Sequence, residues 1–307
     1  MGKGGKMETT TAMRGLLVGT LFLLFGIGGE GSLCAPSDPT VWEVPGTDYA
    51  DTGNFEVVED AGLFAAPSGC ILSYSRYRPA TQGGFPLVLL THGFQRGEAQ
   101  MHGLARHLAA WGLDVVTPDL CHASAQDHDV AADVSDMTAL ADAIRSGRGV
   151  VYAGHSAGGL RSVLAGRDDE HAIAVFGLDL VDGDGLALTA AEELRIPLYG
   201  LGGEPSPCNA DGNGEAVYRA APEARLLRVT EADHCDFEDP TDRLCTAVCA
   251  ERNETFSDDT IRNAIRGLLT AFLLWQGGLD PEGAAWWIPE GDAYQWLIAQ
   301  GLIERRV

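Results

Sequence analysis

A serine in the middle of the chain has the flanking residues of an activated nucleophile. Ser156 stands in the segment Gly154-His155-Ser156-Ala157-Gly158, a Gly-x-Ser-x-Gly pattern. In a nucleophile elbow this pattern forms a sharp turn between a strand and a helix, and the turn exposes the serine hydroxyl. The residues two positions before and after the serine must be small, because a side chain there would clash in the strained backbone. The segment predicts a nucleophile for acyl transfer.

A serine hydroxyl is a poor nucleophile near neutral pH and requires a general base. In enzymes with this kind of elbow the acid and then the histidine follow the serine in the chain, and only His171 and His234 do so here. His171 precedes an apolar run and is expected at the amino end of a strand, on the wrong edge of the sheet. His234 follows the strand-like run 226–230 by a few residues, at the carboxyl edge. We interpret His234 as the base, with a surface histidine between solvated carboxylates as the alternative.

The acid that orients this histidine has several candidates. Asp179 comes directly after the strand-like run 172–178, where the backbone is best defined. Asp182 and Asp184 lie in a Gly-rich turn that follows and also suit a turn-forming role. Glu204 follows the next strand-like run. The sequence favours Asp179 and leaves Asp182 and Glu204 open as alternatives.

The oxyanion of acyl transfer needs backbone N–H donors. One is the amide of the residue after the nucleophile, Ala157, and the second comes from the loop after an earlier strand. The apolar run 87–91 suits such a strand, and Phe94 follows it, so the Phe94 amide is the predicted second donor. Its ring would also offer an apolar face to the substrate. His92 and His155 are interpreted as structural residues.

Alternating strands and helices must position these residues. Strand-like runs occur at 55–59, 70–77, 87–91, 113–117, 150–153, 172–178, 196–201 and 226–230. Segments with helical spacing or composition occur at 98–111, 129–144, 160–165 and 260–275. This alternation predicts an α/β fold with a mostly parallel, doubly wound sheet and helices on both faces.

The composition excludes some partners. The chain has 307 residues, 45% of them hydrophobic and 21% charged, as is ordinary for a globular protein. Its formal net charge is −23, and the only lysines are Lys3 and Lys6. Nucleic acid and anionic lipid surfaces are therefore not expected partners, because both require a basic surface. We expect a monomer.

The first 31 residues have the pattern of an export signal. Two lysines and Arg14 precede the apolar run 15–28, which is shorter than the ~20 residues of a membrane span. Small residues follow it just before Ser32, the expected cleavage site. We therefore expect an exported protein without a membrane span after cleavage: periplasmic, secreted or lipid-anchored through Cys34. An uncleaved anchor is the alternative.

The cysteine content agrees with export into an oxidising compartment. The chain has seven cysteines: Cys34, Cys70, Cys121, Cys208, Cys235, Cys245 and Cys249. We expect most of them to form disulfides, with Cys34 as the odd one and the connectivity open. A zinc site is disfavoured because no second ligand pair has metal spacing, and no metal or organic cofactor is expected.

These features divide the chain into four parts. They are an export signal at 1–31, a surface lead-in at 32–54, a hydrolase domain at 55–276 and an aromatic-rich segment at 277–307. The last part contains Trp286, Trp287, Tyr294 and Trp296. We interpret it as packed on the domain, with an apolar rim at the mouth of the site as the alternative.

Several segments together resemble the chlorophyllase-like α/β-hydrolases. They are 91–94 with 104–120, the elbow 154–159, the segment 177–183, and 207–213 with 233–236. The resemblance extends over about residues 87–239. It implies the α/β-hydrolase fold, a Ser156–Asp179–His234 triad and ester hydrolysis without a cofactor. The position of the acid is also similar to that in the platelet-activating-factor acetylhydrolases.

The leading hypothesis is an exported serine carboxylesterase, or lipase-like enzyme, that acts on a small-molecule or lipid-like ester. A polyester or cutin hydrolase and a chlorophyllase proper are alternatives that share the triad. An alternative of another class is a non-catalytic binding protein on the same fold. All three triad residue types stand in the right order, which argues against that class.

Overall fold

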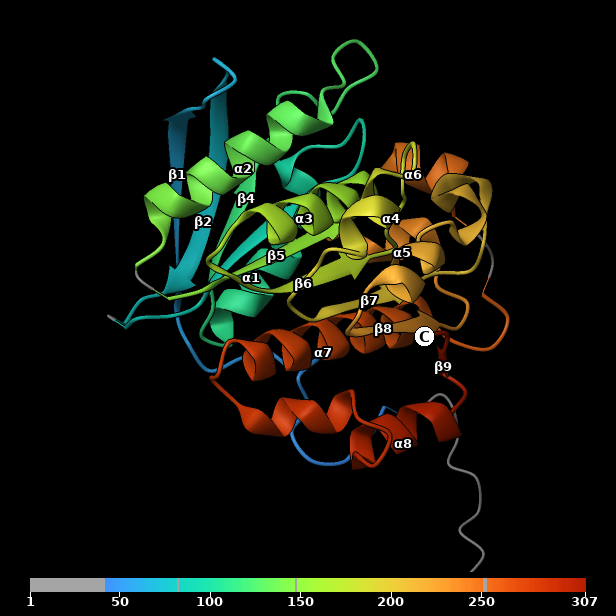
Figure 1. Cartoon of the computed structure of the whole chain (residues 1–307). Helices are drawn as coiled ribbons and strands as arrows, with labels where there is room; N and C mark the ends of the chain where they lie inside the picture. The colour runs from blue at the N-terminus through green and yellow to red at the C-terminus, as the bar shows by residue number, and fades with distance from the viewer. Residues whose placement is uncertain (1–41, 82, 147, 251–252) are drawn as a thin grey trace, which may run out of the picture. The chain divides into compact units, whose positions relative to one another are not determined.

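A nine-stranded sheet forms the centre of the protein in the computed structural model (Figure 1). The structure describes residues 42–307 except 82, 147, 251 and 252, so the expected export signal and Cys34 lie outside it. The strands are β1 (Val57–Ala65), β2 (Ile71–Pro79), β3 (Leu87–Thr91), β4 (Asp114–Pro118), β5 (Val150–His155), β6 (Ala172–Leu178), β7 (Leu198–Gly202), β8 (Ala224–Val229) and β9 (Ile303–Arg305).

The strand order is β1-β2-β4-β3-β5-β6-β7-β8-β9. The strands from β4 to β8 in this order pair in parallel, whereas β1, β2 and β9 pair antiparallel at the two edges. The chain winds outward in both directions from β3 and β5, which places a topological switch point between these two strands. Ligands bind at such a point, outside the carboxyl ends of the strands.

Helices cover both faces of the sheet (Figure 1). In β3 the side chains of Val88 and Leu90 pack with α1 (His102–Ala110) and α7 (Asp258–Gln276). Leu87 and Leu89, which point the other way, pack in the cluster of α2 (Val130–Ile144). The central strands are buried on both faces, as their continuous apolar runs require. The prediction of a doubly wound, mostly parallel α/β sheet is confirmed.

The other α-helices are α3 (Ala157–Asp168), α4 (Leu186–Ala191), α5 (Glu215–Ala220), α6 (Arg243–Val248) and α8 (Asp292–Ala299). Four short 3₁₀ helices complete the described chain: η1 (Glu98–Met101), η2 (Pro207–Gly212), η3 (His234–Phe237) and η4 (Pro281–Trp286). In residues 42–307, apart from the four undescribed positions, no helix has both the length and the hydropathy needed to cross a membrane.

The edge strands differ most from the sequence expectation. We predicted a strand at 55–59, whereas β1 runs from Val57 to Ala65. This strand pairs only with β2 and is largely exposed, so burial does not impose a regular apolar pattern on it. The short strand β9 was not predicted. It pairs antiparallel with β8 and so belongs to the sheet.

In the segment from 277 onward, η4 packs against α7, α8 packs against η4, and β9 joins β8 in the sheet. Trp286 and Trp287 are buried in the same cluster as this helix. The Trp287 indole N–H donates a 2.9 Å hydrogen bond to the Leu268 carbonyl on α7. The Trp286 indole donates to the carbonyl of Thr47, which connects this segment to the beginning of the described chain. Large apolar area and two satisfied indole donors hold these residues in place.

Candidate active site

The strand–turn–helix around Ser156 has the geometry of a nucleophile elbow. The strand β5 ends at His155, the helix α3 begins at Ala157, and Ser156 between them has φ 56° and ψ −125°. A positive φ is strained for a residue with a Cβ atom and persists only where the surroundings enforce it. A Cβ added to Gly154 would lie 2.4 Å from the Gly158 carbonyl carbon. The glycine spacing is therefore a steric requirement of this turn.

Backbone hydrogen bonds connect the elbow to the end of β6. The Ser156 N–H donates to the Leu178 carbonyl at 2.9 Å. The Ser156 carbonyl accepts from the amides of Gly159, at 2.9 Å, and Val181, at 3.2 Å. The residue that follows Leu178 is Asp179, so the same contacts that hold the serine also hold the loop of the predicted acid.

His234 and Asp179 come together although they lie 55 positions apart in the chain. His234 is the first residue of η3, and its Nδ1 lies 2.6 Å from Oδ2 of Asp179. Both residues are buried. With Nδ1–H donating to the carboxylate, the imidazole presents Nε2 as its basic nitrogen. This is the tautomer that a general base beside a serine requires.

The other candidate acids have different partners. The carboxylate of Asp182 accepts the backbone amides of Ala187 and Leu188, at 2.8 and 3.0 Å, and so begins α4. Glu204 accepts from the Glu231 amide at 3.2 Å. Within the described chain, Asp179 is the one candidate acid that contacts the His234 imidazole.

His171 and Asp184, the other histidine and an aspartate of the Gly-rich turn, do not contact the His234 imidazole in the described chain. His171 precedes β6 at its amino end, and its ring Nε2 lies 3.9 Å from a carboxylate oxygen of Glu170. Asp184 stands at φ 59° and lines the cleft described below. The structure does not bring His171 to the carboxyl edge of the sheet, where Ser156 lies.

The predicted oxyanion donors border the same cleft as Ser156. Phe94 follows the end of β3, and Ala157 is the first residue of α3, where the helix dipole favours negative charge. Across the described residues, no acceptor is recorded for the Phe94 amide. A Cβ added to Gly93 would lie 3.0 Å from the Ser156 Cβ, so the main chain before Phe94 passes directly against the nucleophile.

A cleft of about 1100 Å³ opens above Ser156 and His234. Its lining residues all lie between positions 94 and 249. Large apolar side chains border it and stay solvent-exposed: Phe94, Leu186, Leu244 and Val248. Leu244 and Val248 on α6 are 61% and 69% exposed. Such a cleft suits a ligand with a large apolar part.

Polar groups beside the cleft are paired with one another. Arg96 donates two hydrogen bonds to Glu238, at 2.6 and 2.5 Å, and a third to Asp242 at 3.0 Å. Burial raises the pKa of the Glu238 carboxyl, and the Arg96 hydrogen bonds oppose this shift. Burial also lowers the pKa of His155 well below its ordinary value, so His155 is neutral and its Nε2–H donates to the His234 carbonyl at 3.1 Å.

Sequence reasoning missed one residue at this site. Asn209 in η2 is fully buried, and its Nδ2 lies 3.1 Å from Oδ2 of Asp179. No periodicity or motif marks an asparagine in a loop as the neighbour of a carboxylate 30 positions earlier. The segment 207–213 was noted only for its family resemblance.

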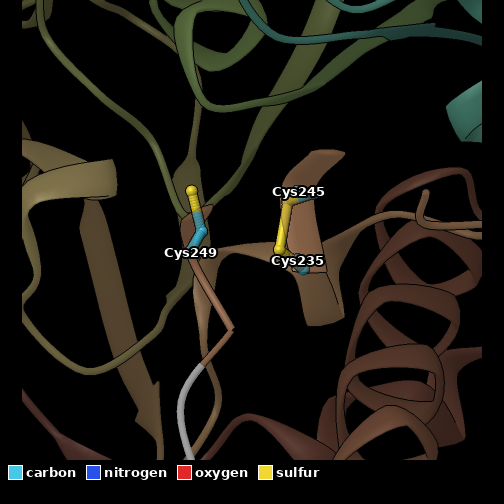
Figure 2. A group of neighbouring side chains, drawn as sticks. All are labelled: Cys235, Cys245 and Cys249. Carbon is cyan, nitrogen blue, oxygen red and sulfur yellow. A yellow bond between two sulfur atoms is a disulfide. The ribbon is translucent and has the colours of Figure 1, made fainter. Parts of the chain in front are cut away.

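Six cysteines form three disulfides: Cys70–Cys121, Cys208–Cys249 and Cys235–Cys245. Two of them flank the site, because Cys208 precedes Asn209 and Cys235 follows His234. Figure 2 shows Cys235, Cys245 and Cys249, whose sulfur atoms all lie within 4.8 Å of one another. All three are in disulfides, so they do not present the thiolates that bind a metal ion. Cys245 and Cys249 are not bonded to each other.

The comparison with known families gives a clear result. Residues 87–306 match the model described as the alpha/beta hydrolase family, which covers most of the chain. The chain belongs to the alpha/beta hydrolase family. A comparison with curated proteins finds no match. As an alpha/beta hydrolase, the protein has the sheet, the elbow position and the strand-end loops that this family uses for hydrolysis.

Proposed function

We propose that this hydrolase is a serine carboxylesterase that uses Ser156, His234 and Asp179 as a catalytic triad. The observation that carries the proposal is the 2.6 Å contact between His234 Nδ1 and Asp179 Oδ2, next to a serine held at positive φ in the same cleft. Backbone strain at Ser156 is expected where presenting the hydroxyl to the cleft matters more than local stability.

The proposed reaction proceeds through an acyl-enzyme. Ser156 Oγ attacks the ester carbonyl carbon while His234 Nε2 takes the hydroxyl proton, and the amides of Phe94 and Ala157 bind the oxyanion. The imidazolium, stabilised by the Asp179 carboxylate, then protonates the leaving alcohol. Water activated by the neutral imidazole hydrolyses the acyl-enzyme, which releases the acid and frees the serine.

The walls of the cleft favour an uncharged, lipophilic ester. Both arginines that line the cleft are already paired: Arg96 with Glu238, and Arg161 with Asp133 at 2.7 Å. A negatively charged substrate would therefore have to break an existing ion pair to find a cation there. Exposed apolar side chains at the rim offer burial to hydrocarbon instead.

We further propose that the enzyme is chlorophyllase-like in its loops and acts outside the cytoplasm as a monomer. The three disulfides support export, because disulfides persist in oxidising compartments. We propose four parts for such an exported enzyme. They are a signal at 1–31, a lead-in at 32–54, a catalytic domain at 55–276 and an aromatic segment at 277–307. Neither the signal nor a lipid on Cys34 falls within the described residues.

A polyester or cutin hydrolase is the second candidate, and the exposed Leu244 and Val248 at the rim of the cleft favour it. A panel of nitrophenyl esters of increasing acyl length, with a chlorophyll and a solid polyester added, tests both functions. Hydrolysis of the soluble esters by the wild type and not by Ser156→Ala supports the proposal. Binding of the esters without any turnover would favour the non-catalytic alternative.

A further inference from the structure

Asn209 has four backbone and side-chain partners, and together they determine which way its amide group faces. Its Oδ1 accepts from the backbone amides of Ser206, at 2.8 Å, and Gly212, at 3.0 Å. Its Nδ2 donates to the Glu204 carbonyl at 2.8 Å. Backbone amides only donate and carbonyls only accept, so a flipped amide would lose all three bonds. The Nδ2 group therefore has to face the Asp179 carboxylate.

We infer that Asn209 is a positioning residue that holds the Asp179 carboxylate in the orientation that His234 requires. The inference rests on the proposed function, because it gives Asp179 the role of the triad acid. Nδ2 of Asn209 lies 3.3 Å from Oδ1 and 3.1 Å from Oδ2, so it bridges both oxygens. The Gly203 amide donates to Oδ1 at 2.9 Å. Donors to both oxygens offset the cost of burying the charge.

The groups that donate hydrogen bonds to Asp179 also differ in charge from a lysine or an arginine. Among the described residues, the groups that donate to Asp179 besides His234 are neutral: the Gly203 amide and the Asn209 side chain. A lysine or arginine here would cancel the negative charge that the imidazolium needs. An asparagine instead solvates the carboxylate and leaves its charge available to His234.

The loop around Asn209 is arranged before any substrate binds. At the start of η2 the Ser206 amide donates to Oδ1 of Asn209 and the Asn209 amide donates to the Ser206 carbonyl, and the adjacent Cys208 is bonded to Cys249. Ala210 and Asp211 stand at φ 50° and 55°, in the left-handed region. These constraints keep the side chain fixed, as a positioning residue requires.

The decisive variant is Asn209→Asp. The new side chain keeps an oxygen that can accept from Ser206 and Gly212. It replaces the donor that faces Asp179 and the Glu204 carbonyl by a second carboxylate oxygen. We expect kcat to fall about 10- to 100-fold, the range for losing one hydrogen bond to a charged group. We expect KM to stay unchanged, because Asn209 does not line the cleft. The two carboxylates would lie too close for both to be ionised, so the proton that they share should also move the acid limb of the kcat profile.

Asn213→Asp is the matched control. Asn213 follows the same loop, and its side chain bonds the backbone amide and carbonyl of Asp182, at 3.0 and 2.8 Å. It makes no recorded contact with Asp179 within the described chain. Equal losses in the two variants, or wild-type kcat in Asn209→Asp, would overturn the inference. So would a failure of both Asn209→Asp and Asn209→Ala to fold while Asn213→Asp folds, because the residue would then be structural.

A measurement without substrate separates this inference from the proposed function. NMR titration of the His234 ring protons in the resting protein reports its pKa directly. A changed titration midpoint of His234 in Asn209→Asp and an unchanged one in Asn213→Asp support the positioning role, whereas no change in either variant overturns it. An absence of esterase activity in the wild-type protein would instead overturn the proposed function, and the titration would still decide the role of Asn209.

Discussion

The backbone amide of Gly203 donates to Oδ1 of Asp179 at 2.9 Å, which leaves Oδ2 to the imidazole of His234. The two carboxylate oxygens thus have separate principal partners. Gly203 follows the end of β7, and Asp179 follows the end of β6, so neighbouring strands set the direction of this carboxylate. The predictions below depend on that direction.

Replacing Ser156 by alanine should abolish ester hydrolysis and leave the fold intact. The loss in kcat is expected to be on the order of 10⁴ to 10⁶, since only binding and oxyanion effects remain. Steady-state kinetics and the far-UV circular dichroism spectrum check the two parts. An organophosphate should label Ser156 in the wild type. Retention of a tenth of the activity would mean that another residue is the nucleophile.

Asp179→Asn should reduce kcat by about 10³ to 10⁴ near neutral pH, because the amide favours the wrong imidazole tautomer. Glu204→Gln is the control. The variant side chain keeps an acceptor oxygen for the Glu231 amide, and position 204 does not touch His234. Asp182→Asn serves the same purpose at the start of α4. A larger loss in Glu204→Gln than in Asp179→Asn would transfer the role of the acid to Glu204.

Mass spectrometry of the exported protein should find a first residue near Ser32 and at most one free thiol. Peptide mapping without reduction should recover the pairs Cys70–Cys121, Cys208–Cys249 and Cys235–Cys245. The reason is that an oxidising compartment allows cysteines at bonding distance to pair. A full-length product with all thiols reduced contradicts both export and pairing.

Leu244→Ser and Val248→Ser should raise KM for long-chain esters by about tenfold and leave acetyl esters nearly unaffected. A long hydrocarbon loses contact area when either side chain is shortened, whereas an acetyl group does not reach α6. Leu63→Ser is the matched control, because Leu63 is 75% exposed on the edge strand β1 and does not line the cleft. A KM that is independent of chain length in both α6 variants would show that α6 is not part of the substrate site.

Asp236→Asn should stabilise the protein at pH 8 and change little at pH 4. Burial, and then the nearby charge of Asp233, raise the pKa of Asp236 to about 6. Its folded pKa lies above the unfolded value of about 3.9, so ionisation opposes folding, and stability is lost as pH rises from about 4 to 6.

Thermal denaturation at the two pH values measures this effect, with an expected rise in Tm of a few degrees at pH 8. The asparagine retains an oxygen for the Asp233 amide, which the wild-type side chain binds at 3.0 Å. Asp51→Asn, at an exposed position, is the control. An equal shift of Tm at pH 4 and pH 8 would contradict the assigned pKa direction.

Local patterns predicted the centre of the fold well. The strand at 172–178 and the helix around 260–275 were placed correctly within a few residues, because burial on both faces, or on one stripe, imposes a clear apolar pattern. The edge strands of the sheet were harder to predict. Strand β1 has no buried face that demands alternation, and β9 has only three residues.

At the site, chain order and strand ends predict Ser156, His234 and Asp179 as a triad. The structure brings His234 and Asp179 together, and catalysis by the three residues remains a proposal. The place of Asn209 was not predictable, because it depends on how the loop after β7 returns to Asp179 at the end of β6. The disulfide pairs were open for the same reason, since cysteine spacing gives no information on how distant loops approach each other.

The hydrogen bonds from Ser156 to Leu178 and from Asp179 to Leu201 hold the serine and the acid to the ends of three adjacent strands. The walls of the cleft instead come from separate excursions of the chain, including the 125–131 stretch and α6. The wall positions that are not disulfide cysteines can therefore be varied without changing the strand ends that hold Ser156 and Asp179. In directed evolution, libraries confined to these positions should alter which esters are accepted. Cys245 has to be kept, because its disulfide partner Cys235 adjoins His234.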